Sequence, residues 1–115
     1  MIYQRDWLMR QIEAMVSAIL RFLLHTSAAE ETTEAQTLQE QIQEAIRSQG
    51  LCRTEDRILE NADGDDPVWL KRAVYFYSEI NKLPDAELEA NNFSREEIHS
   101  GLIEIIRQYG FDGIL

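Results

Sequence analysis

The chain has 115 residues, of which 44% are apolar and 28% are charged, and it contains one cysteine. This length suits a single domain with one hydrophobic core, and one cysteine excludes an internal disulfide framework. The net charge of −10 opposes binding to nucleic acid, whose phosphates are held by lysine and arginine. We therefore expect no nucleic-acid partner.

The charge is distributed unevenly along the chain. Residues 1–25 hold three arginines against two acidic residues, a balance of +1, which leaves −11 for residues 26–115. Only five glycines and two prolines are available for turns, a composition typical of long helices joined by short loops. We predict an all-α fold, with one helical domain over residues 1–115 built as an irregular bundle of about five to six helices.

The first predicted helix covers about residues 4–24 and is the longest. Apolar residues at helical spacing form a broad face that we expect to face the core: Leu8, Met9, Ile12, Met15, Val16, Ile19, Leu20, Phe22 and Leu23. A solvent-exposed face is predicted for Asp6, Arg10, Glu13, Ser17 and Arg21. Between these two faces runs a third line, consisting of Trp7, Gln11, Ala14, Ala18 and His25. Its two alanines allow close approach of a second backbone, and we predict that this line is a protein interface.

The apolar part of this first helix is too short to cross a membrane. Glu13 and Arg21 bracket only seven charge-free residues, whereas a spanning helix needs about 20. Acidic residues before the apolar stretch also disfavour a signal peptide. Because the cysteine is expected to be reduced, we predict a cytoplasmic protein.

The helical body is predicted over about residues 33–110. Thr33 and Gln36 match a capping pair at the start of a helix that ends before Gly50. Residues 25–32 are small and polar and predict a loop. The next helix is expected to be short, with Thr54 as its N-cap and its end near Ala62.

The following helices have clear start signals. Asp66 followed by Pro67 predicts an N-cap and first helical residue, and this helix stops before Pro84, where a short helix to about Ala90 begins. Ser94 and Glu97 then form a capping box for the last helix, with Phe93 and Ile98 placed as a hydrophobic staple. Gly110 ends it.

Two segments of the body resemble one another. Asp56-x-x-Leu59-Glu60 recurs as Asp85-x-x-Leu88-Glu89, so that a short helix followed by a long one is used twice. Stacked helical hairpins of the tetratricopeptide type are therefore an alternative to a plain bundle.

The opening residues resemble those of a known family. Tyr3, Asp6, Trp7 and the Leu8–Glu13 segment match the start of a family of small uncharacterised bacterial helical proteins, and the stretch 88–98 resembles a later part of that family. The resemblance implies a bacterial cytosolic helical protein. It implies no functional residues.

No residue pattern predicts catalysis. Glu96 and His99 form one Glu-x-x-His pair, but a di-iron bundle needs two such pairs and further carboxylates. The Asp63–Asp66 cluster lacks ligands at the ends of a calcium loop, and Cys52 has no evident base beside it. We predict no catalytic, cofactor-binding or metal-binding residues, and no cofactor.

The function predicted from these patterns is that of a protein interaction or self-assembly module, with a homodimer as its specific form. A small-ligand-binding protein or an enzyme, with a pocket between helices, is one alternative. In that case Trp69, Tyr75, Phe76 and Tyr77 are candidates to line a groove, although we expect all but Tyr75 to face the core. The other alternative is attachment of the first helix to a membrane surface, which the acidic remainder of the chain disfavours.

Overall fold

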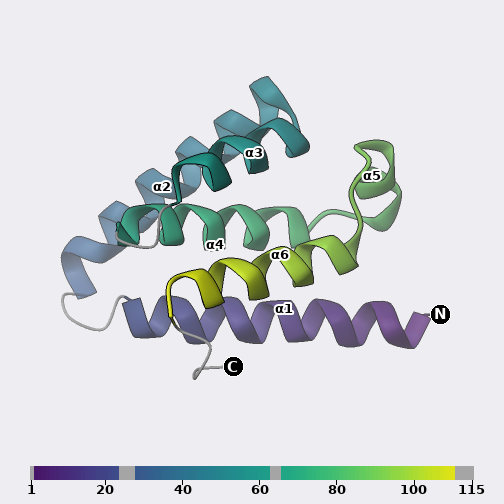
Figure 1. Cartoon of the computed structure of the whole chain (residues 1–115), viewed down its shortest axis with the longest axis horizontal. Coiled ribbons are helices and arrows are strands. Elements are labelled where there is room, and N and C mark those ends of the chain that lie inside the picture. Colours follow the sequence, from purple (N-terminus) through teal and green to yellow (C-terminus); the bar gives the residue numbers. More distant parts are fainter. Residues whose placement is uncertain (1, 24–27, 63–65, 111–115) are drawn as a thin grey trace.

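The computed structural model describes residues 2–23, 28–62 and 66–110, and side chains from 6–23, 36–62 and 66–110. The described residues form six α-helices and no β-strand (Figure 1). The predicted all-α bundle of about six helices is therefore confirmed.

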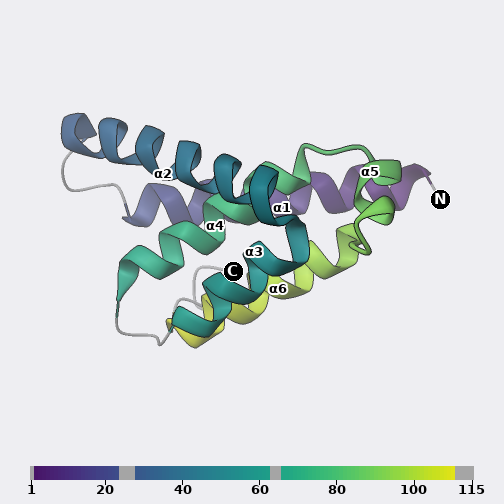
Figure 2. The same cartoon turned by 90° about the horizontal axis from the view of Figure 1, so that it is seen from above.

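Helix α4 (Pro67–Asn81) lies at the centre of the bundle. It packs against α1 (Ile2–Leu23), α2 (Ala28–Gln49), α3 (Leu51–Asn61) and α6 (Arg95–Gln108) (Figures 1 and 2). Because neighbours cover it on several sides, its run from Ala73 to Tyr77 is completely buried. Tyr75 is among these residues, so the expectation that it points away from the core was wrong. Trp69, expected in the core, is only partly buried.

Helix α1 packs along α4 and α6 through the predicted face. Leu8, Ile12, Val16 and Ile19 are buried, and Met15, Leu20 and Leu23 pack against them. Phe22, however, is 56% exposed, so its assignment to the core was wrong. At about 100° per residue it lies roughly 80° from the centre of the buried line, on the side occupied by Trp7.

Helix α2 begins at Ala28 instead of Thr33, so residues 28–32 are helical instead of forming a loop, and the predicted capping pair is wrong. Ala28, Ala29 and two glutamates after them are strong helix formers, which extends the helix upstream of Thr33. Leu38 and Ile42 of this helix are buried.

Gly50 joins α2 to α3 with no intervening loop. Its φ of +88° lies in the left-handed region that favours glycine, and its N–H donates to the carbonyl of Ile46 at 2.9 Å. Helix α3 begins directly afterwards at Leu51. Thr54 is therefore not the N-cap. Its hydroxyl donates to the Gly50 carbonyl at 2.7 Å, a bond made inside the helix.

The start signals of α4 and α6 are confirmed. The Asp66 carboxylate accepts a hydrogen bond from the Val68 N–H at 3.0 Å. The Ser94 hydroxyl oxygen accepts one from the Glu97 N–H at 3.2 Å. These two caps fix where both long helices of the second half begin.

Helix α5 (Asp85–Ala90) occupies one end of the molecule, near the N-terminus of α1 (Figures 1 and 2). Within the described ranges, it forms no interface as extensive as that of α3 with α4. The faint sequence repeat therefore does not produce two equivalent hairpins, and the helices form a bundle around α4.

Candidate functional site

The residues predicted as an interface lie mostly on the outer side of α1. Trp7 is 58% exposed and Ala14 is exposed, while Gln11 and Ala18 are half-buried. His25 lies outside the described residues. Phe22 joins this side of the helix, and we call Trp7, Gln11, Ala14, Ala18 and Phe22 the outer stripe.

The outer stripe is bounded by a polar face and by the core. The polar residues predicted for solvent are all exposed: Asp6, Arg10, Glu13, Ser17 and Arg21. Trp7 and Phe22 stand at the two ends of the stripe, about 22 Å apart at 1.5 Å per residue, with the small Ala14 and Ala18 between them. The helix thus presents two exposed aromatic rings separated by two small residues.

A buried arginine holds the end of α4 against its neighbours. Arg95, at the first position of α6, is only 5% exposed. Its guanidinium donates to the Asn81 side-chain oxygen at 3.0 Å, to the Leu83 carbonyl at 2.9 Å and to the Asp85 carboxylate at 2.8 Å. Asn81 in turn donates from Nδ2 to the Met9 carbonyl of α1 at 3.3 Å. This network, which we call the Arg95 network, links α1, α4, α5 and α6.

Only one feature of the sequence points to this network. An arginine in the first turn of a helix is disfavoured by the helix dipole, so its presence there indicates another role. The partners of Arg95 could not be named, because they are 10 to 14 residues away along the chain.

A second buried polar contact joins α3 to α4. The Tyr77 hydroxyl donates to the Glu55 carboxylate at 2.7 Å. Burial raises the pKa of Glu55, and the Tyr77 hydrogen bond opposes part of that effect, while burial and the Glu55 carboxylate raise the pKa of Tyr77. Gly101 of α6 lies against this tyrosine, since a Cβ at position 101 would be 2.7 Å from Tyr77 Cζ.

The one cysteine lies in the first turn of α3 and donates from its thiol to the Asn91 carbonyl at 3.4 Å. Desolvation raises the pKa of Cys52, and the carboxylates of Glu55, Asp56 and Glu97 raise it further. The thiolate, which is the nucleophilic form, is therefore disfavoured.

The described part of the chain brings no three His, Cys, Asp or Glu side chains together as metal ligands. His99 is half-buried and Glu96 is exposed. Asp63 to Asp65 lie outside the described residues, and Asp66 acts as the N-cap of α4. No helix in the described ranges is both long and apolar enough for a membrane span.

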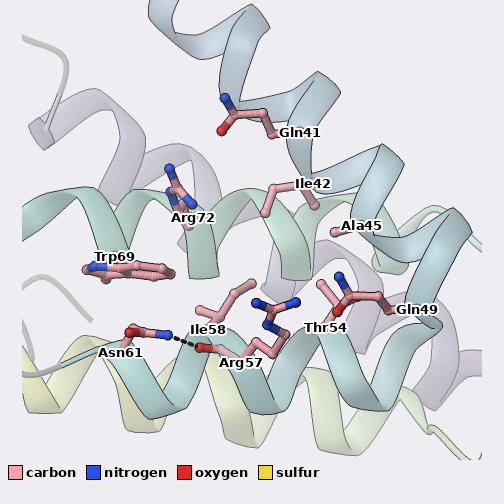
Figure 3. Close-up of a pocket in the computed structure, with 10 residues that line it drawn as sticks. All are labelled: Gln41, Ile42, Ala45, Gln49, Thr54, Arg57, Ile58, Asn61, Trp69 and Arg72. Carbon is pink, nitrogen blue, oxygen red and sulfur yellow. Dashed lines mark hydrogen bonds between the residues drawn. The ribbon is translucent and has the colours of Figure 1, made fainter.

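One pocket lies where α2, α3 and α4 meet (Figure 3). Its volume is about 180 Å³. The lining residues are Gln41, Ile42, Ala45 and Gln49 from α2, Thr54, Arg57, Ile58 and Asn61 from α3, and Trp69 and Arg72 from α4. Of the four aromatic residues considered for a groove, only Trp69 lines this pocket, because Tyr75, Phe76 and Tyr77 are buried.

A family of unknown function (DUF6483) matches residues 2–110 of the chain. The chain belongs to this family. The DUF6483 match runs from the first residue of α1 to beyond the end of α6, and it includes both the outer stripe and the pocket. The resemblance of the opening residues to an uncharacterised family is thus confirmed. No curated protein and no solved structure matches the chain.

Proposed function

We propose that this DUF6483 chain is a self-assembly module that forms a homodimer through the outer stripe of α1. The observation that supports this most is the exposure of two large aromatic residues, Trp7 at 58% and Phe22 at 56%, on one side of one helix. Aromatic side chains are enriched at protein interfaces, and exposed apolar patches mark interaction sites.

The pattern of the stripe favours a second copy as its partner. Two copies of α1 packed antiparallel about a two-fold axis can place Trp7 of one copy against Phe22 of the other. The same register places Gln11 of each copy against Ala18 of the other, with Ala14 of both copies near the two-fold axis. Aromatic residues then meet at both ends, and the alanines allow close approach in the middle.

Charge also favours pairing through α1. Residues 1–25 carry +1, whereas the remaining chain carries −11. Two copies that met through other surfaces would bring acidic groups together, at a cost in electrostatic free energy. Pairing through α1 keeps the acidic bodies apart.

The exposed rings supply a substantial part of the area that a stable dimer needs. An aromatic side chain buries about 150–250 Å² when fully covered. Four rings, each a little over half exposed, would therefore contribute on the order of 500 Å², against a lower limit of about 1,200 Å² for a stable interface. The remaining area must come from the flanking residues of α1.

The test is light scattering after size exclusion at tens of micromolar, comparing the wild type with Ala14→Glu and Ser17→Glu. Both substitutions add one negative charge to an exposed position of α1, but only Ala14 lies in the outer stripe. We expect the wild type and Ser17→Glu to have twice the chain mass of 13.4 kDa, and Ala14→Glu to have the mass of one chain. Equal masses for the two variants would contradict the proposed surface.

A vesicle assay separates this proposal from the membrane-surface alternative. If the wild-type chain is monomeric and floats with anionic liposomes, then lipid, and not a second copy, covers the outer stripe. We expect no flotation, because anionic lipid attracts basic segments. We further propose a cytoplasmic location, since Cys52 is a free thiol, and a bacterial source, on the resemblance of the opening residues.

A further inference from the structure

The pocket between α2, α3 and α4 carries positive charge in an otherwise acidic chain. Two of its ten lining residues are arginines, Arg57 and Arg72, and none is aspartate or glutamate. Figure 3 shows both guanidinium groups, one from α3 and one from α4, in the space that α2 borders. The chain has 21 acidic residues. A pocket lined by two arginines and no carboxylate therefore has a charge opposite to that of the chain as a whole.

Some arginines of the chain form ion pairs, and others, such as Arg53 and Arg107, form none within the described residues. Arg47 pairs with Glu44 at 2.6 Å, and Arg95 pairs with Asp85 at 2.8 Å. Within the described ranges, neither Arg57 nor Arg72 forms an ion pair. Arg72 instead lies over the ring of Trp69, with Cζ 4.8 Å from the ring centroid.

Two polar atoms at the pocket are buried without a hydrogen-bond partner among the described residues. They are Nε of Arg72, a donor, and Oε1 of Gln49, an acceptor. Buried polar groups normally have partners, because leaving one unsatisfied costs about 1–3 kcal/mol. Each atom belongs to a side chain that lines the pocket, and an occupant supplies the missing hydrogen bond once that side chain turns toward it.

The rest of the wall is partly polar and partly apolar. Ile42, Ala45, Ile58 and the ring of Trp69 supply surface for a carbon skeleton. A volume of about 180 Å³ corresponds to roughly six waters at ~30 Å³ each. This size suits a small organic molecule better than a nucleotide or a peptide.

We propose that the pocket binds a small organic acid. Its carboxylate is held by the guanidinium groups of Arg57 and Arg72, whose planar forks match a carboxylate. Its carbon skeleton packs on Ile58 and Trp69, and a hydroxyl or amino group donates to Gln49. This site is formed by α2, α3 and α4, and it is separate from the outer stripe of α1.

A thermal-shift measurement at constant ionic strength tests this proposal, with 4-hydroxybenzoate as the probe. Its neutral amide, 4-hydroxybenzamide, serves as the control for charge, and inorganic phosphate as the control for a free anion. We expect about 10 mM 4-hydroxybenzoate to raise the Tm of the wild type by about 3 °C or more. The amide and phosphate should give less than a third of that rise.

Three variants locate the binding. Arg57→Gln and Arg72→Gln should abolish the rise in Tm, whereas Arg53→Gln, which changes an exposed arginine of α3 outside this pocket, should keep it. If Arg72→Gln does not fold, Arg57→Gln decides, because Arg57 is exposed and its replacement leaves the core intact. No rise in the wild type, an equal rise with the amide or phosphate, or an undiminished rise in Arg57→Gln would overturn the proposal.

Discussion

Adding a methyl group at Gly101 should have a clear effect on the free energy of unfolding. A Cβ there would overlap the hydroxyl and ring of Tyr77, which is fully buried and bonded to Glu55. Alanine is favoured over glycine in a helix by about 1 kcal/mol, but overpacking of a core typically costs about 1–3 kcal/mol. Because the tyrosine cannot move without losing its hydrogen bond, the overlap should outweigh the gain in helix propensity.

We therefore predict that Gly101→Ala lowers the free energy of unfolding by about 1–2 kcal/mol, measured by urea denaturation. Ser100→Ala, at the exposed neighbouring position, is the control and should change the free energy by less than about 0.5 kcal/mol. A Gly101→Ala variant as stable as the wild type would show that Tyr77 is free to move.

Glu55 gives the stability a dependence on pH. Burial raises its pKa above the ordinary value of 4.5, and Asp56 and Glu97 raise it further, while the Tyr77 hydrogen bond lowers it in part. The folded state therefore binds a proton more readily than the unfolded state, and the stability from this group is lost as the pH rises through the folded pKa. Glutamine at this position can still accept the Tyr77 hydrogen bond, but it cannot ionise.

The predicted result is that Glu55→Gln gains stability relative to the wild type as the pH rises from about 4 to about 7. Urea denaturation of both proteins at the two pH values gives this difference, in which the contributions of the other carboxylates cancel. A difference that stays constant or shrinks with rising pH would show that the carboxylate is not penalised by burial.

At the scale of the helices, the Arg95 network determines how α1, α5 and α6 meet the end of α4. Removing one partner of a buried ion pair typically costs about 3–5 kcal/mol, because the remaining charge and carbonyls lose their partner. Asp85 is 34% exposed at its side chain, and water can reach it, so the lower end of that range applies.

Arg95→Met should accordingly lower the free energy of unfolding by about 3 kcal/mol, as measured by chemical denaturation. Arg107→Met, in the last turn of the same helix and exposed, is the matched control and should have little effect. A loss below about 1 kcal/mol for Arg95→Met would mean that the network contributes no more than a surface pair.

The helices that could be predicted from sequence are those with local signals. Asp66 with Pro67 and Ser94 with Glu97 were identified correctly, because each cap depends only on residues within one turn. Thr33 and Thr54 were not caps. A threonine hydroxyl can also bond to a carbonyl four residues earlier, as Thr54 does, and the residue type does not distinguish the two cases.

The candidate sites were less predictable than the fold. The exposure of Trp7 follows from its place outside the apolar face of α1, whereas Phe22 lies at the edge of that face, where helical spacing does not decide between burial and exposure. Arg57 and Arg72 come from different helices, and only the packing of α2 on α3 and α4 brings them to one pocket.

For the whole molecule, one side of α1 meets the core, as the burial of Leu8, Ile12, Val16 and Ile19 shows. We propose that the adjoining side meets a second copy. The chain would then associate through its least acidic segment and leave its acidic helices in solvent. In such a dimer the pocket between α2, α3 and α4 stays open in both copies.

Sedimentation equilibrium of the wild-type chain from about 1 to 100 µM tests this most directly. The weight-average mass should rise with concentration toward twice 13.4 kDa. A mass of one chain throughout that range would contradict pairing through the outer stripe.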